Sequence, residues 1–468
     1  MTRLVVLHTN DVHGNVEGLA RIATLVEQIH AESHCPVVYV DAGDIEETTT
    51  WISNATKGAA MHRLLSAAGC AAAAVGNASW FRYGTGVLPD HAAAASYPLL
   101  LANLRAEDGS RLEDVVDSTL LEIGGSRLGL IGVTAPALAF GFDDLGVSRI
   151  EEAPLVRRLA GELRERGADH VVLLSHLGLD VPDDVVDDRR LAPALDGAVD
   201  AVLGAHTHDL LPEGERIGGV LVAQAGSFGS HLGRLELGPD GARADVIAVG
   251  DDVPLHPAVL AAADEAESDV AAFVSEIVGE LAEPLDPTAA ARWLADVLRR
   301  RLDADVALVT PGQAFTKGLP AGPLTRSSLW DACDSSANPG IAVIRGARLA
   351  EMLARGRDPE FARGTARPLR GRPRGVLQTS GDEPIEPGRD YRVAGTDWEL
   401  HPLGGLVAPE WGIEPRYEFP TILREVIEEH LGGDVDSFVS TGRFRRTCGR
   451  PARPDSGTAS GAFARNGR

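Results

Sequence analysis

The stretch LVVLHTNDVHG (residues 4–14) decides the fold of this 468-residue chain. Its first four residues are apolar and predict a short buried strand, and the polar residues that follow predict a loop at the end of that strand. Asp11 and His13 lie two residues apart in this loop, so at a strand end their side chains point the same way. A carboxylate and an imidazole placed in this manner can reach one cation.

The same arrangement recurs four times in the first half of the chain. Residues 37–40, 71–75, 170–174 and 198–203 are predicted strands, and helices are predicted at 18–34, 59–68 and 155–166. Each strand is followed by polar side chains that can ligate a metal. In chain order these are Asp44, Asn77, His176, His206 and His208. The alternation predicts a layered α/β domain in which the strand ends converge on one site.

Each of these side chains has an ordinary explanation when it is taken alone. Asp44 follows a glycine, as in many turns, and His176 can be a hydrogen-bonded histidine of the core. Five successive strand ends that carry only Asp, Asn and His are not expected by chance. Such a set suits two divalent cations among Mn²⁺, Zn²⁺, Fe²⁺ and Co²⁺. A carboxylate that bridges two ions about 3.5 to 4 Å apart is the usual arrangement for attack of water on phosphorus.

Composition excludes several classes of partner. The formal net charge of −24 opposes binding to nucleic acid or to anionic membranes, whereas bound cations can still attract a small phosphorylated substrate. The sequence contains no apolar run of about 18 residues, so no membrane span is predicted. The apolar run at residues 4–7 is too short to be the core of a signal peptide. We therefore expect a cytoplasmic protein that acts on a small molecule. Its oligomeric state stays open.

The length predicts two domains, and 44% apolar residues are enough to build both cores. We predict a metal-binding domain at residues 1–255 and a linker helix within 256–280. A smaller substrate-binding domain follows at 281–447, opening with a helix at 288–301 and a strand at 306–309. Within it, residues 355–374 are predicted to form an arginine-dense loop. A disordered tail rich in Gly, Ser, Pro and Arg is predicted at 448–468.

Six short motifs make the sequence resemble the calcineurin-type metallophosphoesterases, and among them the 5′-nucleotidase family. They are NDVHG (10–14), DAGD (41–44), GN (76–77), SHLG (175–178), GAHTH (204–208) and QAG (224–226). The resemblance implies one metal held by Asp11, His13, Asp44 and His208. It implies a second metal held by Asp44, Asn77, His176 and His206, with Asp44 bridging. Asp44 and Asn77 are thereby implied to take part in catalysis.

The resemblance extends into the second half of the chain, through DPTAAARWLADVLRR (286–300), GLPAGPLTRSSLWDA (318–332) and EPGRDYRVAGTDW (386–398). It implies a four-layer αββα metal domain followed by a smaller α/β domain that binds the nucleoside. Trp398, and with it Trp330, is a candidate for stacking on a base, although core packing explains each equally well. The family hydrolyses 5′-nucleotides, 2′,3′-cyclic nucleotides or nucleotide pyrophosphates, so we expect a phosphoric ester hydrolase of this kind.

The chain departs from the family at its fourth motif. Family members read Gly-Asn-His-Glu-Phe-Asp, with a His that assists catalysis, whereas this chain reads GNASWFRYG at 76–84 and carries Ala78 in place of that His. Trp80, Phe81 and Tyr83 in this segment either belong to the core or line the substrate side of the site. A phosphate-binding stretch of the second domain is also altered to TPGQAFTK at 310–317, where Lys317 could replace the usual arginine. A family turn survives only in part, around Asn338.

Two interpretations of these departures remain. In the first, the enzyme is active, and loss of the His matters mainly for poor leaving groups, because a general acid contributes roughly 10²- to 10⁴-fold in rate. In the second, the chain is a catalytically weak or inactive regulatory protein that binds metal and nucleotide. All seven candidate ligands are present, and this favours the first interpretation.

Overall fold

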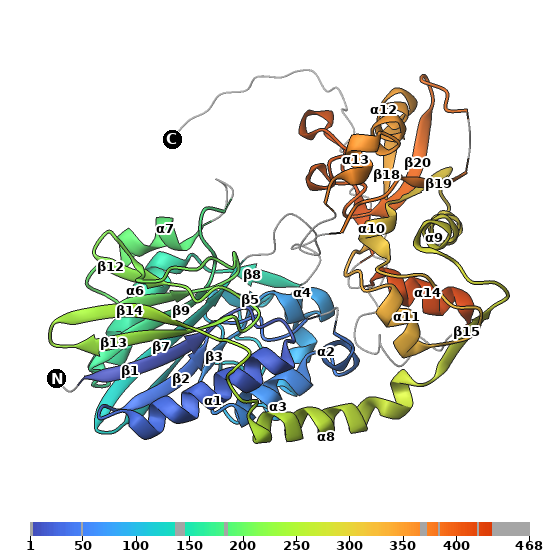
Figure 1. The fold of residues 1–468 in the computed structure, drawn as a ribbon. Coiled ribbons are helices and arrows are strands. Elements are labelled where there is room, and N and C mark those ends of the chain that lie inside the picture. Colours follow the sequence, from blue (N-terminus) through green and yellow to red (C-terminus); the bar gives the residue numbers. More distant parts are fainter. Residues whose placement is uncertain are drawn as a thin grey trace, which may run out of the picture. The chain divides into compact units, whose positions relative to one another are not determined.

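Two six-stranded sheets form the first half of the chain in the computed structural model (Figure 1). The structure describes residues 3–47, 50–135, 146–181, 186–365, 372–381, 384–418 and 421–432. The first sheet has the order β14-β13-β1-β2-β3-β4, with β1 to β4 parallel. Its strands are β1 (Leu4–Thr9), β2 (Val37–Asp41), β3 (Ala73–Ala74), β4 (Leu99–Leu100), β13 (His231–Gly238) and β14 (Gly241–Ala248).

The second sheet has the order β11-β12-β10-β9-β7-β6, with β7, β9, β10 and β12 parallel. Its strands are β6 (Ser118–Ile123), β7 (Ser126–Thr134), β9 (His170–His176), β10 (Ala201–Gly204), β11 (Glu215–Ile217) and β12 (Val220–Ala223). A two-stranded ribbon of β5 (Leu104–Ala106) and β8 (Val147–Arg149) lies outside both sheets. Five of the parallel strands of the two sheets, β1, β2, β3, β9 and β10, correspond to the strands predicted to end in the site.

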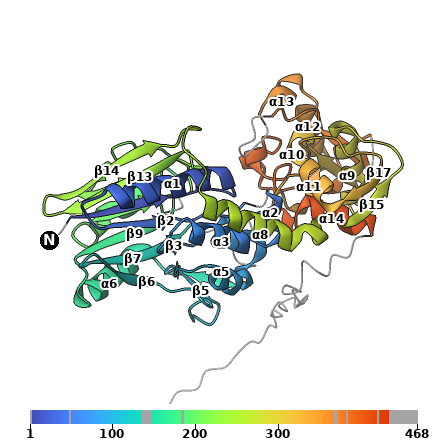
Figure 2. The ribbon, with the colours of Figure 1, turned by 60° about the horizontal axis from the view of Figure 1, so that its bottom comes forward.

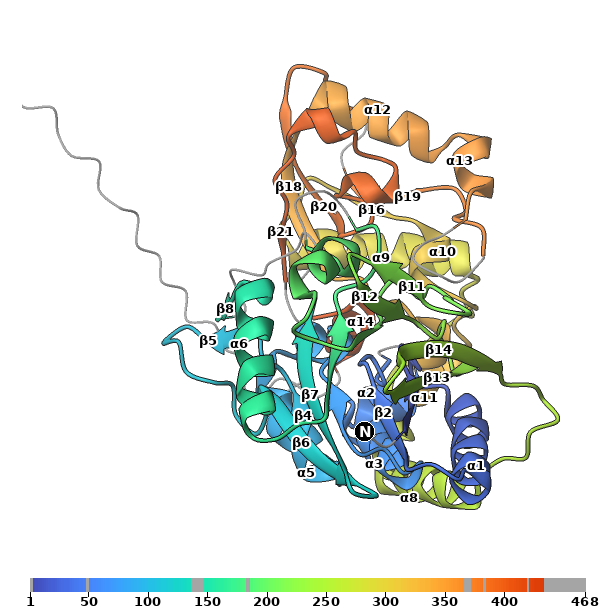
Figure 3. The same cartoon turned by 90° about the vertical axis from the view of Figure 1, so that its left-hand side faces the viewer.

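Helices cover the outer face of each sheet (Figures 2 and 3). Packed on the first sheet are α1 (Val16–Glu32), α3 (Ala59–Ala67) and α8 (Pro257–Val274), and on the second are α6 (Glu152–Glu165) and η3 (Ala192–Leu195). Shorter elements nearby are α2 (Trp51–Ala55), α4 (Ala78–Tyr83), η1 (Thr85–Val87), α5 (Leu88–Ala94) and α7 (Asp188–Leu191). Asn15 caps α1 by accepting a hydrogen bond from Gly18 N.

Three separate apolar cores define four layers. Leu4 and Val6 of β1 pack with Val172 and Leu174 of β9 between the two sheets. Leu7 of β1 points the other way, into the core beneath α1, α3 and α8. A third core lies between the second sheet and α6. Because side chains alternate along a strand, each buried strand serves two cores at once. The predicted αββα architecture is confirmed.

A five-stranded sheet forms the centre of the second half of the chain, in the order β19-β16-β20-β18-β21. Its strands are β16 (Val306–Val309), β18 (Pro339–Arg345), β19 (Gln378–Gly381), β20 (Asp390–Thr396) and β21 (Arg416–Tyr417), and β15 (Ile277–Leu281) pairs separately with β17 (Gly322–Thr325). The helices are α9 (Pro287–Arg301), α10 (Pro311–Ala314), α11 (Arg326–Ala332), α12 (Gly346–Gly356), α13 (Pro359–Arg363) and α14 (Leu423–Leu431), with single turns η4 (Pro402–Gly404) and η5 (Pro409–Trp411). This is the α/β composition expected of a second domain; the predicted domain boundaries themselves stay a prediction.

The predicted linker helix is shorter than expected. It ends at Val274, and residues 277–281 form β15, which pairs antiparallel with β17. The buried Arg326 side chain donates to the carbonyl of Phe273 (2.7 Å) and pairs with Glu276, so side-chain contacts hold the chain where the helix stops. The predicted loop at 355–374 contains part of α12 and all of α13, while its residues 366–371 lie outside the described residues, as does the predicted tail.

In the described part of the chain, no helix is long and apolar enough to cross a bilayer.

The two sheets approach closely at Gly132 of β7, where an added Cβ would lie 2.4 Å from Leu100 Cβ and 2.5 Å from Leu100 O. We predict that Gly132→Ala lowers the free energy of unfolding by about 1–3 kcal/mol, because backbone atoms must shift to admit the methyl group. The matched control is Gly161→Ala on α6, where no atom lies within 4 Å. It should leave the protein equally or more stable, since Ala favours helix. Equal stability of Gly132→Ala and wild type in chemical denaturation would contradict this packing.

Candidate metal centre

The carboxyl ends of five parallel strands bring the seven predicted ligands to one edge of the two sheets. Two ligands come from the loop after β1, one from the loop after β2 and one from the loop after β3. One ligand is the last residue of β9, and two ligands follow β10. In that order they are Asp11, His13, Asp44, Asn77, His176, His206 and His208. Parallel strands end at the same edge of a sheet, and ligands of open α/β sheets bind there.

Asp11, His13 and His208 form one group of converging donor atoms. The Nε2 atoms of His13 and His208 are 3.1 Å apart. Asp11 Oδ1 lies 3.7 Å from His13 Nε2 and 3.5 Å from His208 Nε2. Donor atoms at these separations suit a single small cation.

Asp44 and His176 form a second group, which again includes Asp11. His176 Nε2 lies 3.2 Å from Asp44 Oδ2 and 3.1 Å from Asn77 Oδ1. Asp44 Oδ2 is also 3.9 Å from His13 Nε2, so this carboxylate lies between the two groups. The His206 ring packs against that of His176, with 5.3 Å between their centroids, and lies outside both groups of donor atoms.

The backbone at five of these residues is left-handed. Asp11, His13, Asp44, His206 and His208 have φ between 48° and 73°, and they are half of the non-glycine residues with positive φ in the described ranges. Left-handed conformations cost side-chain-bearing residues about 1–3 kcal/mol each and gather at functional sites. Asp11 and His13 lie beyond the end of β1, so these left-handed turns, and not the strand alternation inferred from the sequence, aim their side chains.

Backbone carbonyls fix the orientation of two of the imidazoles. The carbonyl oxygens of Glu46 and Ala42 can only accept hydrogen bonds, so His13 Nδ1 donates to the first (3.2 Å) and His176 Nδ1 to the second (3.0 Å). The Nε2 atom of each ring therefore faces the carboxylates, and when the ring is neutral this atom offers its lone pair to a cation there. Histidines that bind metals show this pattern. The donor set and its orientation therefore fit divalent cations.

Two glycines make room for Asp44. A Cβ at Gly76 would lie 2.0 Å from Asp44 Oδ1, and one at Gly43 would lie 2.8 Å from His176 Nδ1. The amide of Ala78, the first residue of α4, donates to Asp44 Oδ1 (2.8 Å). These contacts explain why glycine occurs at both positions.

The site is strongly polarised. Burial alone would raise the pKa of Asp44, but the charges of His176 and His13 hold it well below its usual value. Burial opposes protonation of His176, yet the carboxylates of Asp44 and Asp11 raise its pKa to about 10. The same negative field attracts a metal cation.

Two further residues of the site do not stand out in the sequence. Asn10 donates to Asp11 Oδ2 (2.8 Å) and to the carbonyl of Gly226 (2.6 Å), which ties the first motif to the last. The Phe228 ring lies 5.4 Å from that of His13 and 5.6 Å from that of His208, and its amide donates to the Asp11 carbonyl. Asn10 lies within the NDVHG motif, and Phe228 lies two residues after the QAG motif. These positions were the signals that the sequence offered.

The aromatic candidates divide clearly. Trp80 is fully buried in the core beneath α1, and Trp330 is buried and donates to Glu428 Oε1 (2.6 Å), so both are packing residues. Trp398 is partly exposed beside Asp397, whose carboxylate accepts from the amide of Asn338.

The remaining candidates for substrate binding are already engaged in contacts. The side chain of Asn338 donates to the carbonyl of Thr421 (2.8 Å). The exposed Lys317 pairs with Asp331 at 3.2 Å. Of the two, only Lys317 could turn toward a ligand without leaving a buried group unsatisfied.

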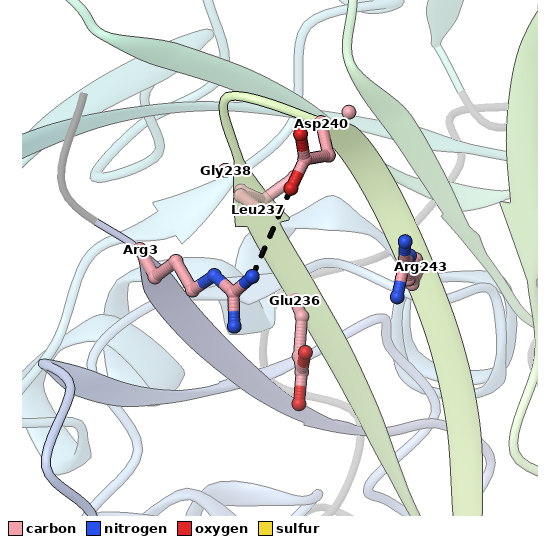
Figure 4. Close-up of a pocket in the computed structure, with 7 residues that line it drawn as sticks. Arg3, Glu236, Leu237, Gly238, Asp240 and Arg243 are labelled. Carbon is pink, nitrogen blue, oxygen red and sulfur yellow. Dashed lines mark ion pairs between the residues drawn. The ribbon is translucent and has the colours of Figure 1, made fainter.

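A small surface pocket lies at the opposite end of the first sheet (Figure 4). Arg3, which precedes β1, pairs with Asp240 there at 3.7 Å, beside Glu236 and Arg243. The candidate ligands follow the other end of β1, so this pocket is separate from the candidate metal centre.

The chain is similar to several known phosphoesterases. Residues 4–210 match the model of the calcineurin-like phosphoesterase family. An uncharacterized metallophosphoesterase of Bacillus subtilis, YunD, is 27% identical over 376 residues, which cover 75% of this chain and 77% of that protein. A 5′-nucleotidase of Diplobatis ommata is 28% identical over 330 residues, 61% of this chain and 55% of that protein. The chain thus spans little more than half the length of that nucleotidase.

Solved structures extend the likeness across both halves of the chain. A 5′-nucleotidase precursor from Thermus thermophilus aligns with 92% of this chain and 96% of its own, at a TM-score of 0.61 and 20% identity. A NAD nucleotidase from Haemophilus influenzae aligns over the same shares of the two chains, with a TM-score of 0.59 and 14% sequence identity. The matched family consists of metal-dependent phosphoesterases that bind divalent ions. Residues 4–210 therefore match the calcineurin-like phosphoesterase family, and over most of its length the chain has the fold of the 5′-nucleotidases.

Proposed function

We propose that the chain is a two-metal phosphoesterase that hydrolyses nucleotides or related phosphate esters and anhydrides. The observation that carries this proposal is the pair of adjoining donor groups with Asp44 between them. The match of residues 4–210 to the calcineurin-like phosphoesterases supports hydrolysis of a phosphate ester in general. The second metal and the nucleotide substrate are the parts that we add.

In this proposal the ligand sets divide around Asp44. Asp11, His13 and His208 would hold one ion, Asn77, His176 and His206 would hold the other, and Asp44 would be shared by both. Divalent ions in such a site polarise the phosphoryl oxygens and lower the pKa of a water molecule, which supplies the nucleophile at neutral pH.

The chain's own residues keep these donors in place. The backbone amide of His206 donates to both Asp11 oxygens (3.1 and 2.9 Å), so this carboxylate is aimed before any cation binds. The Ala78 amide does the same for Asp44. Such prior orientation of donors reduces what must be reorganised during the reaction.

Ala78 sets the expected substrate preference. It follows Asn77 directly and begins α4, where the family carries a proton-transferring His, and its methyl group cannot donate a proton. A nucleoside alkoxide is a poor leaving group that needs this proton, whereas a phosphate or a nitrophenolate is acidic enough to leave without it. We therefore propose that anhydrides and activated diesters are cleaved better than nucleoside monophosphates.

We predict that purified enzyme with Mn²⁺ or Zn²⁺ has a kcat/KM at least about 10²-fold higher for UDP-glucose or a nitrophenyl diester than for AMP. The measurement is steady-state phosphate or nitrophenol release over the three substrates, with each metal in turn. A preference for AMP would overturn the proposed role of Ala78. Absence of turnover on every substrate would instead favour the regulatory interpretation.

We predict that Ala78→His raises kcat/KM for AMP by about 10- to 100-fold and leaves the nitrophenyl diester nearly unchanged. The gain stays below the full effect of a general acid because the partner Asp of the family motif is absent as well. Ala258→His, on the exposed first turn of α8, makes the same chemical change away from the site and should alter neither activity. An equal gain on both substrates would show that the new His acts on something other than the leaving group.

A further inference from the structure

A second cluster of metal-ligating side chains lies beside the candidate metal centre. Glu46 comes from the loop after β2, His62 from α3 and His91 from α5. Their exposed fractions are 4%, 3% and 1%. No motif in the sequence pointed to them, because they are 16 and 29 residues apart in three different elements.

The donor atoms of the cluster converge on the Glu46 carboxylate. His62 Nε2 is within hydrogen-bond distance of Glu46 Oε1 (2.7 Å), and His91 Nδ1 lies 3.5 Å from the same oxygen. The two imidazole rings are 4.6 Å apart between centroids. Two donors bound about 2.0–2.1 Å from a tetrahedral ion are about 3.3 Å apart, and the two observed separations lie on either side of that value.

The far nitrogen of each ring has its own partner. His91 Nε2 donates to the carbonyl of Lys57 (2.6 Å), and His62 Nδ1 is 2.8 Å from the hydroxyl of Tyr97. Because a carbonyl can only accept, the neutral His91 ring carries its lone pair on Nδ1, the atom that faces Glu46. A lone pair that faces a carboxylate oxygen is repulsive unless a cation lies between them.

The same arrangement orients His13 and His176 in the candidate metal centre. There too, one ring nitrogen donates to a backbone carbonyl and the other faces a carboxylate. This outer hydrogen bond is a general property of histidines that ligate metals. His91 therefore repeats the pattern of the centre beside it, while the far nitrogen of His62 contacts a hydroxyl group instead of a carbonyl.

Close packing holds the cluster in this form. Gly58 has a φ of +94°, and a Cβ there would lie 2.8 Å from both Glu46 Cγ and His91 Nε2. The turn that supplies the Lys57 carbonyl is thus pressed against two members of the cluster. A simple buried ion pair would need only one imidazole beside the carboxylate. The presence of a second imidazole therefore indicates a different role for the cluster.

We propose that Glu46, His62 and His91 hold a further divalent cation, separate from the dinuclear centre. Two His and one Glu are a ligand set that Zn²⁺ takes in proteins. Because all three side chains are nearly inaccessible to solvent, the ion is structural and joins the β2 loop to α3 and α5. The backbone carbonyl of Glu46 accepts from His13 Nδ1, so the same ion would also steady a ligand of the centre.

The test uses the full chain, stripped with a chelator, reloaded with Zn²⁺ and freed of excess metal before elemental analysis. We expect about three Zn²⁺ per wild-type chain and about two for His91→Gln. The matched control is His34→Gln, an exposed histidine, which should keep the wild-type content. An unchanged content in folded His91→Gln, or two or fewer ions in wild type, would overturn the proposal.

A second variant separates this site from the dinuclear one and does not depend on the folding of His91→Gln. Asp44→Asn disables the proposed bridge, so it should still retain about one tightly bound Zn²⁺ per chain. Co²⁺ loaded into this variant should show the strong visible absorption of a tetrahedral site. A folded Asp44→Asn protein that binds no metal would overturn the further site, whatever the outcome for phosphoesterase activity.

Discussion

The loops after β1 and β2 are joined by backbone hydrogen bonds, and the rest of the candidate site depends on this contact. The amide of Asp11 donates to the carbonyl of Gly43 (2.9 Å), and the amide of His13 donates to that of Asp44 (3.0 Å). These bonds keep three residues in left-handed conformations that they would not adopt unaided. Parallel pairing of β1 with β2 sets the two loops side by side, so the sheet supports the strained turns.

The positions of the other ligands depend on this contact. Asp44 reaches its position only because Gly76 leaves space for its carboxylate, and β9 then brings His176 to it from the second sheet. The close approach of the sheets at Gly132 lets ligands from both meet at one edge. The negative charge of the carboxylates is therefore concentrated in a site that excludes solvent, and such a site favours the binding of divalent cations. Ala78 leaves these metal contacts intact and bears only on proton transfer.

Much of this was predictable from the sequence, because apolar runs and polar loops mark strand ends directly. A layered α/β fold and the meeting of the ligands at one edge follow from that pattern, whereas the four-layer arrangement was implied by the resemblance to the metallophosphoesterases. Other features depend on tertiary contacts that no local pattern carries. Strand β3 has only two residues where five were predicted, and residues 277–281 leave the predicted helix to pair with β17. Glu46, His62 and His91 meet only through the packing of α3 and α5, so their cluster could not be foreseen.

The central claim is that Asp44 lies between two metal ions held by the strained loops. Anomalous diffraction from crystals grown with Mn²⁺ tests it most directly, because each bound ion gives a peak at a measurable position. The account predicts two peaks about 3.5 to 4 Å apart, with the Asp44 carboxylate in contact with both. A single peak at this edge of the sheets, or two peaks with Asp44 bound to only one, would contradict it.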